Sequence, residues 1–453
     1  MSFPLWVNNK ADAVVYVWYS LKSYYCRVYC TGPRHSFTAY ILPCSFFIME
    51  NLYDANCLYR AFLAAQKASP MKPQTQRYAM DWLHNIALLY DSLQNRSYAP
   101  SGKSQFIINE RGKTRLIRAA PLKDKIVQHA LCDDVLLPAV RPKLIYDNYA
   151  SLEKRGVTMA RKRFEIMLHR YYREHKSNEG YILLMDFSGY YDNLRHGLVC
   201  KMMSALIDSN DSISLWLLRE MIKCCRKDVS FLSPAEVEAL FYGKYKALDY
   251  IGIPEEQLTG ERFLYKGLDI GDQVAQIAAV YFPTVIDNLI KIVLGEKYYG
   301  RYMDDSSLLG ETVEHLLGVL EKVQAVADPH GLILNPNKVR IIPLGKTFQY
   351  LQIKYSLTPT GAVVKRINPK RLTSMRRKLK KLAVMVKEGR RDYLSVRNMF
   401  KGWALSYYKI MSKAQRQNMD NLFNSLFEKE ESEYENALQV RPEYRHIYWG
   451  GAY

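Results

Sequence analysis

The sequence lacks several features that would restrict its function at once. No apolar run approaches the roughly 18 uninterrupted residues that span a membrane, and the longest candidate, residues 40–49, is broken by Pro43 and Ser45. The 8 cysteines form no paired CxxC knuckles and have no companion histidine spacing, so no zinc site is expected and the thiols are predicted to be reduced. No internal repeat or low-complexity tract is present. We therefore expect a cytoplasmic protein without a membrane partner.

Acidic residues are scarce relative to basic ones. The 453 residues include 64 lysines and arginines against 45 aspartates and glutamates, a net charge of +19. Such an excess indicates a polyanionic partner, either nucleic acid or an acidic membrane surface. The 35 tyrosines favour nucleic acid, where ring stacking and phosphate contacts act together, although tyrosine is also an ordinary core residue. The length predicts roughly three structural units.

The pattern along the chain mixes helical and strand-like segments. Residues 49–93 are helical in pattern, and residues 106–117 alternate like a basic β-hairpin. Helices are predicted at 124–137 and 158–172, and the short apolar run 181–185 is typical of a buried strand. This mixture predicts an α+β fold. Residues 370–388 form a further predicted helix, apolar on one face and densely basic on the other.

Two adjacent aspartates occupy the predicted tip of a second hairpin. The sequence Tyr302-Met303-Asp304-Asp305 lies between an aromatic approach and an apolar exit. Neighbouring carboxylates repel each other strongly unless a cation lies between them. A solvated turn is the ordinary alternative, because aspartate is a common turn residue.

A third aspartate, Asp186, follows the predicted strand 181–185. The ordinary alternative for a strand-end aspartate is a helix N-cap. If this strand and the hairpin are neighbours in one antiparallel sheet, Asp186 would join Asp304 and Asp305. Three carboxylates arranged in this way can bridge two metal ions about 4 Å apart, as phosphoryl and nucleotidyl transfer require.

These segments resemble motifs of reverse transcriptases. Residues 186–192 (DFSGYYD) resemble motif A and residues 302–305 (YMDD) resemble motif C. Further blocks follow in the order of the family: the fingers hairpin at 106–117, the blocks VQHAL at 127–131 and DNYAS at 147–151, motif B at 267–276, motif D at 330–338 and motif E at 348–352. The resemblance covers residues 49–427 and implies a right-hand polymerase.

The resemblance also implies a division of the chain. It implies N-terminal helices and fingers at 49–180, a palm at 181–357 with an insertion near 198–265, a thumb at 358–428 and a C-terminal tail at 429–453. Residues 1–48 are an extension of uncertain function, and Met49 is an alternative start of the protein.

Each motif residue receives a role from the resemblance. Asp186, Asp304 and Asp305 are the expected catalytic and metal-binding carboxylates, Phe187 is a further metal-binding position, and Lys338 is the expected general acid, with a plain surface lysine as its alternative. The expected substrate-binding residues are Lys113, Arg115, Tyr191, Gly271 and Gln276. The expected nucleic-acid-binding residues are Arg376, Arg377, Lys378, Lys380 and Lys381, unless these form only a solvated face.

A physical argument supports two of these roles, and the family pattern supports a third. Lys113 and Arg115 alternate on one face of a strand, so both can meet a triphosphate, and the planar fork of arginine suits phosphate oxygens best. A solvated basic hairpin is the alternative. In this family a bulky ring at the position of Tyr191 excludes a ribose 2′-hydroxyl, which indicates deoxynucleotide substrates.

The resemblance thus implies an RNA-directed DNA polymerase that uses dNTPs, an RNA template, a DNA or RNA primer and two Mg²⁺ ions, with Mn²⁺ as a substitute. Motif B resembles the form found in diversity-generating retroelements and some phage-defence enzymes, although Ala275 and Gln352 depart from the family pattern. A small accessory protein or a cognate structured RNA is an expected partner. The alternative is a group II intron maturase that acts mainly as an RNA-binding splicing scaffold. Tyr191 and YMDD disfavour an RNA-directed RNA polymerase.

Overall fold

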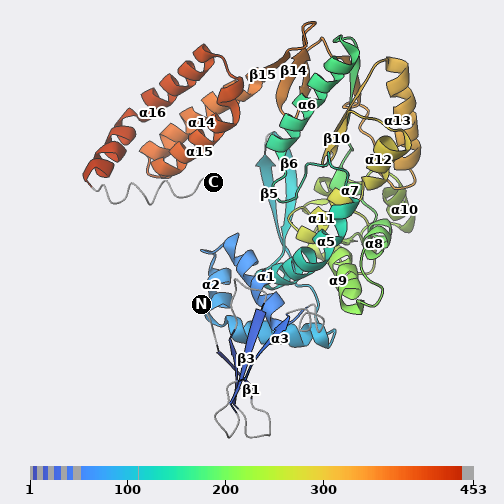
Figure 1. The fold of residues 1–453 in the computed structure, drawn as a ribbon, viewed down its shortest axis with the longest axis vertical. Helices are drawn as coiled ribbons and strands as arrows, with labels where there is room; N and C mark the ends of the chain where they lie inside the picture. The colour runs from blue at the N-terminus through green and yellow to red at the C-terminus, as the bar shows by residue number, and fades with distance from the viewer. Residues whose placement is uncertain are drawn as a thin grey trace. The chain divides into compact units, whose positions relative to one another are not determined.

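The computed structural model describes residues 4–7, 14–18, 25–31, 38–43, 53–110 and 112–440, which form a mixed α+β protein (Figure 1). The predicted α+β class is therefore confirmed. Contacts divide the chain into two units. Unit 1 comprises Met1–Ala139, Met203–Cys224 and Gly271–Val274, and unit 2 comprises Val140–Met202, Cys225–Ile270 and Ala275–Tyr453.

Unit 1 contains a four-stranded sheet, a hairpin and several helices. The strands β1 (Pro4–Val7), β2 (Val14–Trp18), β3 (Tyr25–Thr31) and β4 (Thr38–Pro43) pair antiparallel in chain order. The helices are α1 (Ala55–Lys67), α2 (Pro73–Met80), α3 (Trp82–Gln94), α4 (Leu122–Leu131) and α9 (Ser212–Lys223), with a π-helical turn at Cys132–Leu136 and the short α5 (Leu137–Val140) after α4. Strand β5 (Ser104–Glu110) pairs with β6 (Lys113–Ala119), as the alternation at 106–117 predicts. The alternative start at Met49 and the turn residue Arg111 lie outside the described residues.

The central sheet of unit 2 has the strand order β10-β11-β7-β12, and every pairing is antiparallel. The strands are β7 (Tyr181–Met185), β10 (Tyr299–Tyr302), β11 (Asp305–Gly310) and β12 (Arg340–Pro343). Strand β7 lies inside the sheet, with Ile182 and Leu183 fully buried. Its continuous apolar sequence follows from that position, because both faces of the strand are covered.

Helices and a second sheet surround this centre. The helices are α6 (Val157–His175), α7 (Tyr190–Asn193), α8 (His196–Ser204), α10 (Pro234–Tyr242), α11 (Gln273–Tyr281), α12 (Thr284–Asn288) and α13 (Val313–Ala327). Strands β13 (Phe348–Tyr350), β14 (Ile353–Leu357) and β15 (Val363–Ile367) form the second sheet, and β8 (Lys227–Asp228) pairs with β9 (Phe263–Leu264). Helix α6 packs through Phe164 against Phe348 and Tyr355. Although α6 falls in the predicted 49–180 segment, these contacts belong to unit 2.

One apolar stretch among the described residues, Gln273–Val293, has the length and composition of a membrane-crossing helix. Buried core helices pass the same test of length and composition, and 56% of this window is buried inside the protein. The stretch also contains Asp287, which is fully buried in an ion pair with Arg301. Its apolar character therefore has an explanation in the packing of unit 2.

The C-terminal part of unit 2 is helical. It consists of α14 (Pro369–Lys387), α15 (Tyr393–Tyr407) and α16 (Lys413–Val440). Asn368 caps α14, and Leu372, Met375 and Leu379 recur on its buried face, as the apolar spacing predicts. These helices share one apolar core.

Residues 429–440, which fall in the predicted C-terminal tail 429–453, continue helix α16. Helix α16 has non-helical backbone angles at Phe427 but continues to Val440. The side chain of Glu431 accepts a hydrogen bond from Arg397 at 2.9 Å, and Tyr434 packs against Tyr393. These contacts fix the end of the helix to α15, which the local acidic composition could not predict. Residues 441–453 lie outside the described residues.

Candidate active site

The tip of the β10–β11 hairpin lies beside the end of β7. Tyr302 pairs with Asp305 across the turn, and Ser306 pairs with Met185. Asp305 is therefore next to the residue that follows β7, which is Asp186, only 4% exposed. The strand and the hairpin are thus neighbours in one antiparallel sheet, the arrangement under which the sequence predicts a joint site.

The hairpin tip is held by a buried arginine. Met303 adopts a positive φ of 55°, unusual for a residue with a side chain. Its carbonyl oxygen accepts a hydrogen bond from Nη1 of Arg301 at 3.0 Å. The Arg301 side chain is 1% exposed and pairs with Asp287, 0% exposed, at 2.6 Å. Sequence reasoning missed both residues, and the only signal was a cation directly before YMDD.

Negative charge is concentrated at this end of the sheet. Burial, followed by the charges of Asp304 and Asp186, raises the pKa of Asp305 to about 7. The Asp305 side chain still reaches solvent. Phe187 has no ligand atom in its side chain, so it can contribute only its main-chain carbonyl oxygen. Carboxylate and carbonyl oxygens are the donors that Mg²⁺ and Mn²⁺ prefer, so the residues present fit a divalent cation of this kind.

Lys338 contacts Asp186, one of these carboxylates. Its Nζ lies 2.6 Å from Oδ2 of Asp186. Burial alone would lower the pKa of Lys338, but the hydrogen bond to Asp186 and the charges of Asp304 and Asp305 raise it above the usual value. The main chain of this segment is attached to the end of β7, because the amide of Asn335 donates to the Asp186 carbonyl at 2.8 Å. The ammonium group occupies a position beside Asp186 where positive charge is favourable.

Tyr191 lies in α7, directly after the Asp186 segment. Burial, with a smaller contribution from Asp304, raises the pKa of Tyr191 above its usual range. The ring therefore stays neutral and forms part of the wall near Asp304. The neighbouring Tyr190 is fixed by donating to the Ala279 carbonyl at 2.6 Å.

The remaining predicted residues are distributed over both units. Gln276 belongs to unit 2, is exposed and donates from Nε2 to Ser151 Oγ at 2.8 Å. Lys113 and Arg115 lie on β6 in unit 1, and Gly271, with a φ of 117°, is also in unit 1. This backbone conformation is one that glycine adopts at little cost. Five cations on α14 are all exposed: Arg376, Arg377, Lys378, Lys380 and Lys381.

Two acidic residues of the 267–276 segment form buried ion pairs that sequence reasoning also missed. Asp269 pairs with Lys227 in unit 2, and Asp272 pairs with Lys103 in unit 1. In addition, the Gly267 carbonyl lies 2.8 Å from Nε2 of His196. These contacts fix the segment, and no sequence signal connects partners this far apart in the chain.

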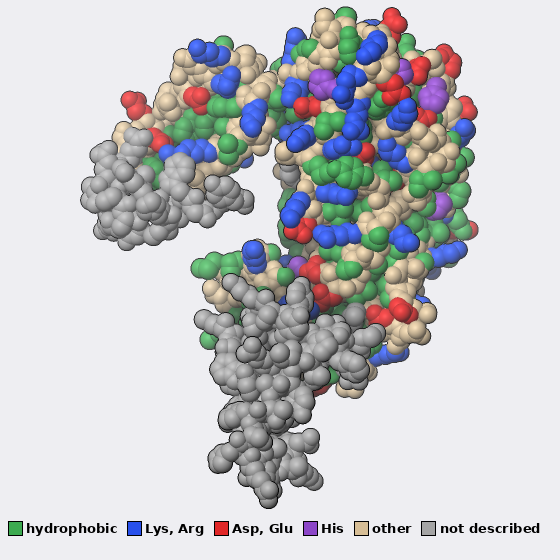
Figure 2. All heavy atoms as spheres, in the orientation of Figure 1, with side chains coloured by type: hydrophobic (Ala, Val, Ile, Leu, Met, Phe, Trp, Pro, Cys, Tyr) green, Lys and Arg blue, Asp and Glu red, His purple; other side chains and the backbone are tan. Residues whose placement is uncertain are grey.

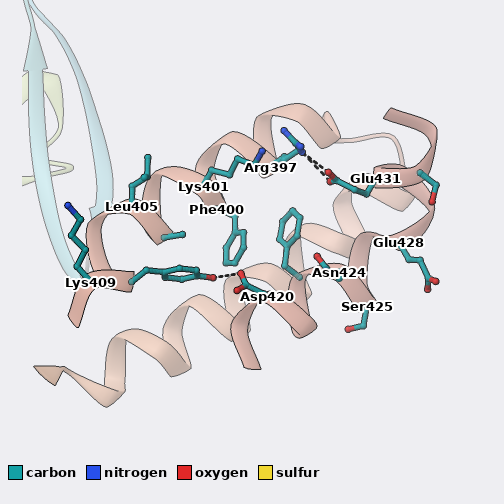
Figure 3. A pocket seen from close by; sticks show the side chains of 14 residues that line it. Arg397, Phe400, Lys401, Leu405, Lys409, Asp420, Asn424, Ser425, Glu428 and Glu431 are labelled. Atoms are coloured by element: carbon teal, nitrogen blue, oxygen red, sulfur yellow. Dashed lines mark hydrogen bonds and ion pairs between the residues drawn. The ribbon is translucent and has the colours of Figure 1, made fainter. Parts of the chain in front are cut away.

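A cavity of about 1010 Å³ between α15 and α16 is lined by Phe400, Leu405 and Phe423, among other residues (Figure 3). It is bordered by the Arg397–Glu431 ion pair. Its lining, as far as the described residues extend, includes none of the residues predicted for catalysis or nucleic-acid binding. The cavity therefore belongs to the packing of the helical region and not to the carboxylate site.

Together, three carboxylates at one end of an antiparallel sheet, a lysine beside Asp186 and an aromatic wall form a candidate site for metal-dependent phosphoryl transfer. Residues 102–355, more than half of the chain, match the family described as reverse transcriptase (RNA-dependent DNA polymerase). The chain belongs to this reverse transcriptase family, whose members use divalent metal.

The solved structures found in the comparison include telomerases. The telomerase of Candida albicans, in complex with a TWJ fragment of telomeric RNA, is 12% identical with a TM-score of 0.41, covering 75% of this chain and 56% of that chain. Apo telomerase of Candida tropicalis is 14% identical with a TM-score of 0.37, covering 58% and 48%. A form of that enzyme truncated from its C-terminal domain is 11% identical with a TM-score of 0.36, covering 60% and 58%.

The chain thus spans between 48% and 58% of the length of these telomerase chains. No curated protein matches the sequence.

Proposed function

We propose that the chain is an RNA-directed DNA polymerase that adds dNTPs to a DNA or RNA primer on an RNA template by two-metal nucleotidyl transfer. The single observation that carries this proposal is the β7–β11 register, which sets Asp186 beside Asp305 at the hairpin tip. The raised pKa of Asp305 supports it, because cations would relieve the repulsion that disfavours the charged form.

When bound, two Mg²⁺ ions, or Mn²⁺ in their place, would activate the primer hydroxyl and stabilise the leaving pyrophosphate. Asp186, Asp304 and Asp305 would hold them, with the main-chain carbonyl of Phe187. Lys338 gives a proton to the leaving pyrophosphate, since its ammonium group already lies at Asp186. Arg301 acts as a positioning residue through the Met303 carbonyl.

Other residues of the chain bind the nucleotide and the template–primer. Lys113 and Arg115 bind the triphosphate of the dNTP, and Tyr191 excludes a 2′-hydroxyl. Gly271 and Gln276 lie against the nascent base pair. In this proposal the parts of the chain act as the fingers, palm and thumb of a right-hand polymerase. The exposed cations of α14 contact the template–primer backbone without reading sequence.

The biological setting is a further part of the proposal. The form of residues 270–276 favours a retroelement of the diversity-generating type or a phage-defence system, acting in the cytoplasm with a small accessory protein or a structured RNA. Sequencing of the products copied from a mixed-sequence template tests the diversity-generating role. Errors concentrated at template adenines support it, and uniformly distributed errors contradict it.

The activity itself is tested by dNTP incorporation on poly(rA)/oligo(dT) with Mg²⁺ or Mn²⁺. Wild type is compared with Asp304→Asn/Asp305→Asn and with the control Asp249→Asn/Asp328→Asn, which removes two exposed aspartates elsewhere. We expect incorporation by wild type and control and none by the site variant. Absence of incorporation in all three, with tight RNA binding retained, would favour the splicing-scaffold alternative.

A further inference from the structure

A basic groove runs along α6 in unit 2, at a distance from the carboxylates. It encloses about 580 Å³, and five of its described lining residues are cationic: Arg163, Arg170, Arg173, Lys291 and Lys297. Three of them come from α6. Arg163 and Arg170 are seven residues apart, two helical turns, so they lie on the same side of the helix. Figure 2 shows lysine and arginine side chains gathered on the face where α6 lies.

The acidic residues in the groove do not balance these charges. The described lining contains two, Asp147 and Glu174. Asp147 accepts from Nε of Arg163 at 2.8 Å, and Glu174 accepts from Nζ of Lys297 at 2.5 Å. The side chains of Arg170 and Arg173 are exposed and face a lining of net positive charge. An anionic ligand would complete this arrangement.

Lys291 is a further cation of the groove. It is half-buried, and its Nζ donates to the Lys297 carbonyl at 2.5 Å. Burial lowers the pKa of Lys291. An anion in the groove would stabilise the charged form of this amine, because it offsets the loss of hydration.

An exposed tyrosine, Tyr146, lies next to Arg163 of the groove. Tyr146 exposes 62% of its surface. The guanidinium carbons of Arg155 and Arg163 lie 5.8 and 4.8 Å from the ring centre. Unpaired bases stack on aromatic rings and on guanidinium planes, while arginines bind the adjoining phosphates. The groove therefore combines the two kinds of contact that a single strand needs.

The main chain that follows Tyr146 connects the groove to the β10–β11 hairpin. Asn148 forms a parallel bridge with Arg301 of β10. The Arg301 amide donates to the Asp147 carbonyl at 3.0 Å. Tyr146 thus precedes a segment that runs along the edge of β10, the strand that leads to Asp304.

We propose that this groove binds single-stranded RNA, through its phosphates and a base stacked at Tyr146, outside the template–primer duplex. This inference rests on the proposed function in one respect, which is that the bound RNA is the strand that carries the template. The binding itself is independent of catalysis.

The test is binding of a fluorescent oligouridylate to the full chain while an unlabelled RNA–DNA template–primer saturates the duplex site. Three proteins are compared with wild type: Arg170→Gln/Arg173→Gln, Tyr146→Ala, and the control Lys322→Gln/Lys346→Gln, which removes two exposed cations elsewhere in unit 2. All substituted side chains are exposed, although the Tyr146 ring also contacts Arg155 and Arg163. We therefore expect every variant to fold, and thermal melting checks this.

We expect wild type and control to bind the oligouridylate equally, and each groove variant to bind it about tenfold more weakly. The logarithm of the binding constant falls linearly with the logarithm of salt concentration, and each phosphate contact on a single strand contributes roughly 0.7 to this slope. The slope of the arginine variant should therefore be smaller in magnitude than that of wild type by about 1.4. Equal affinity and equal slope in all four proteins would overturn the proposal.

Two further arms separate the alternatives. In one arm, phosphatidylserine vesicles replace the oligouridylate. If the groove variants lose vesicle binding but keep RNA binding, the groove binds a membrane surface and the inference is overturned. In the other, dNTP incorporation is measured on the same proteins. A wild type that is inactive but binds RNA through the groove would overturn the proposed function and leave this inference standing.

Discussion

The ammonium group of Lys338 lies 2.6 Å from Oδ2 of Asp186, the carboxylate at the end of the central strand of unit 2. Asp186 is almost fully buried, whereas the Lys338 side chain is 41% exposed. The lysine can therefore leave the carboxylate without any rearrangement of the core. In the absence of cations it stabilises a site that carries three carboxylates, and in the proposed reaction it is already placed to donate a proton.

Replacement of Lys338 should reduce the chemical step more than substrate binding. We expect Lys338→Gln to lower kcat by about 100-fold or more with little change in KM for dNTP, since general acids typically contribute this much. Single-turnover incorporation measures it. Lys338→Arg is the matched control, because arginine keeps the charge but does not release its proton. Wild-type rates in Lys338→Arg would contradict the general-acid role.

The stability of the metal-free protein should fall as pH rises. The pKa of Asp305 is raised to about 7 in the folded protein, against about 3.9 in an unfolded chain. Between these values the folded state binds more protons, so the free energy of unfolding decreases with increasing pH. Because Asp305 reaches solvent, screening reduces the effect to about 1 kcal/mol.

Thermal unfolding in EDTA at pH 5 and pH 8 measures this dependence. Asp305→Asn should reduce the change in melting temperature between pH 5 and pH 8, and it should melt at a higher temperature than wild type at pH 8. Asp249→Asn, an exposed aspartate paired with Lys246, should behave as wild type does. A wild-type protein that becomes more stable across this window would contradict the assignment.

The Arg301–Asp287 pair should be essential to the fold beneath the hairpin. Arg301→Leu leaves the Asp287 carboxylate buried and unpaired, which should cost about 3–5 kcal/mol of unfolding free energy. Arg301→Leu/Asp287→Leu removes both charges and should cost less. Urea unfolding of both proteins and of wild type measures the difference. A double variant less stable than the single one would show that the pair is not the source of the loss.

The same pair marks the limit of what sequence could predict. Strand β7 and the hairpin tip follow from local patterns, an apolar run and adjacent carboxylates, and Lys338 followed from the resemblance of its segment to motif D. Arg301 and Asp287 are joined only because α12 packs near β10, and no periodicity predicts that. Helix α16 beyond Phe427 depends similarly on the distant partner Arg397. Local composition specifies an element, whereas buried ion pairs depend on how elements pack.

Tyr191 should control the sugar of the incoming nucleotide. Its ring is largely buried near Asp304, so truncation opens space without removing a charge. We expect Tyr191→Ala to lose roughly 10- to 200-fold of the discrimination between dNTP and rNTP. Tyr191→Phe keeps the ring and should retain the wild-type discrimination between dNTP and rNTP. The ratio of kcat/KM for dTTP and UTP is the measurement, and unchanged discrimination in Tyr191→Ala would remove this residue from the substrate pocket.

The most direct test of the central claim, that the three carboxylates hold the catalytic cations, is Mn²⁺ binding followed by electron paramagnetic resonance. The titration uses the full chain with template–primer and a non-hydrolysable dNTP analogue. The account predicts two bound ions in wild type and in Asp249→Asn/Asp328→Asn, and loss of this binding in Asp304→Asn/Asp305→Asn. Equal Mn²⁺ binding by all three proteins would contradict it.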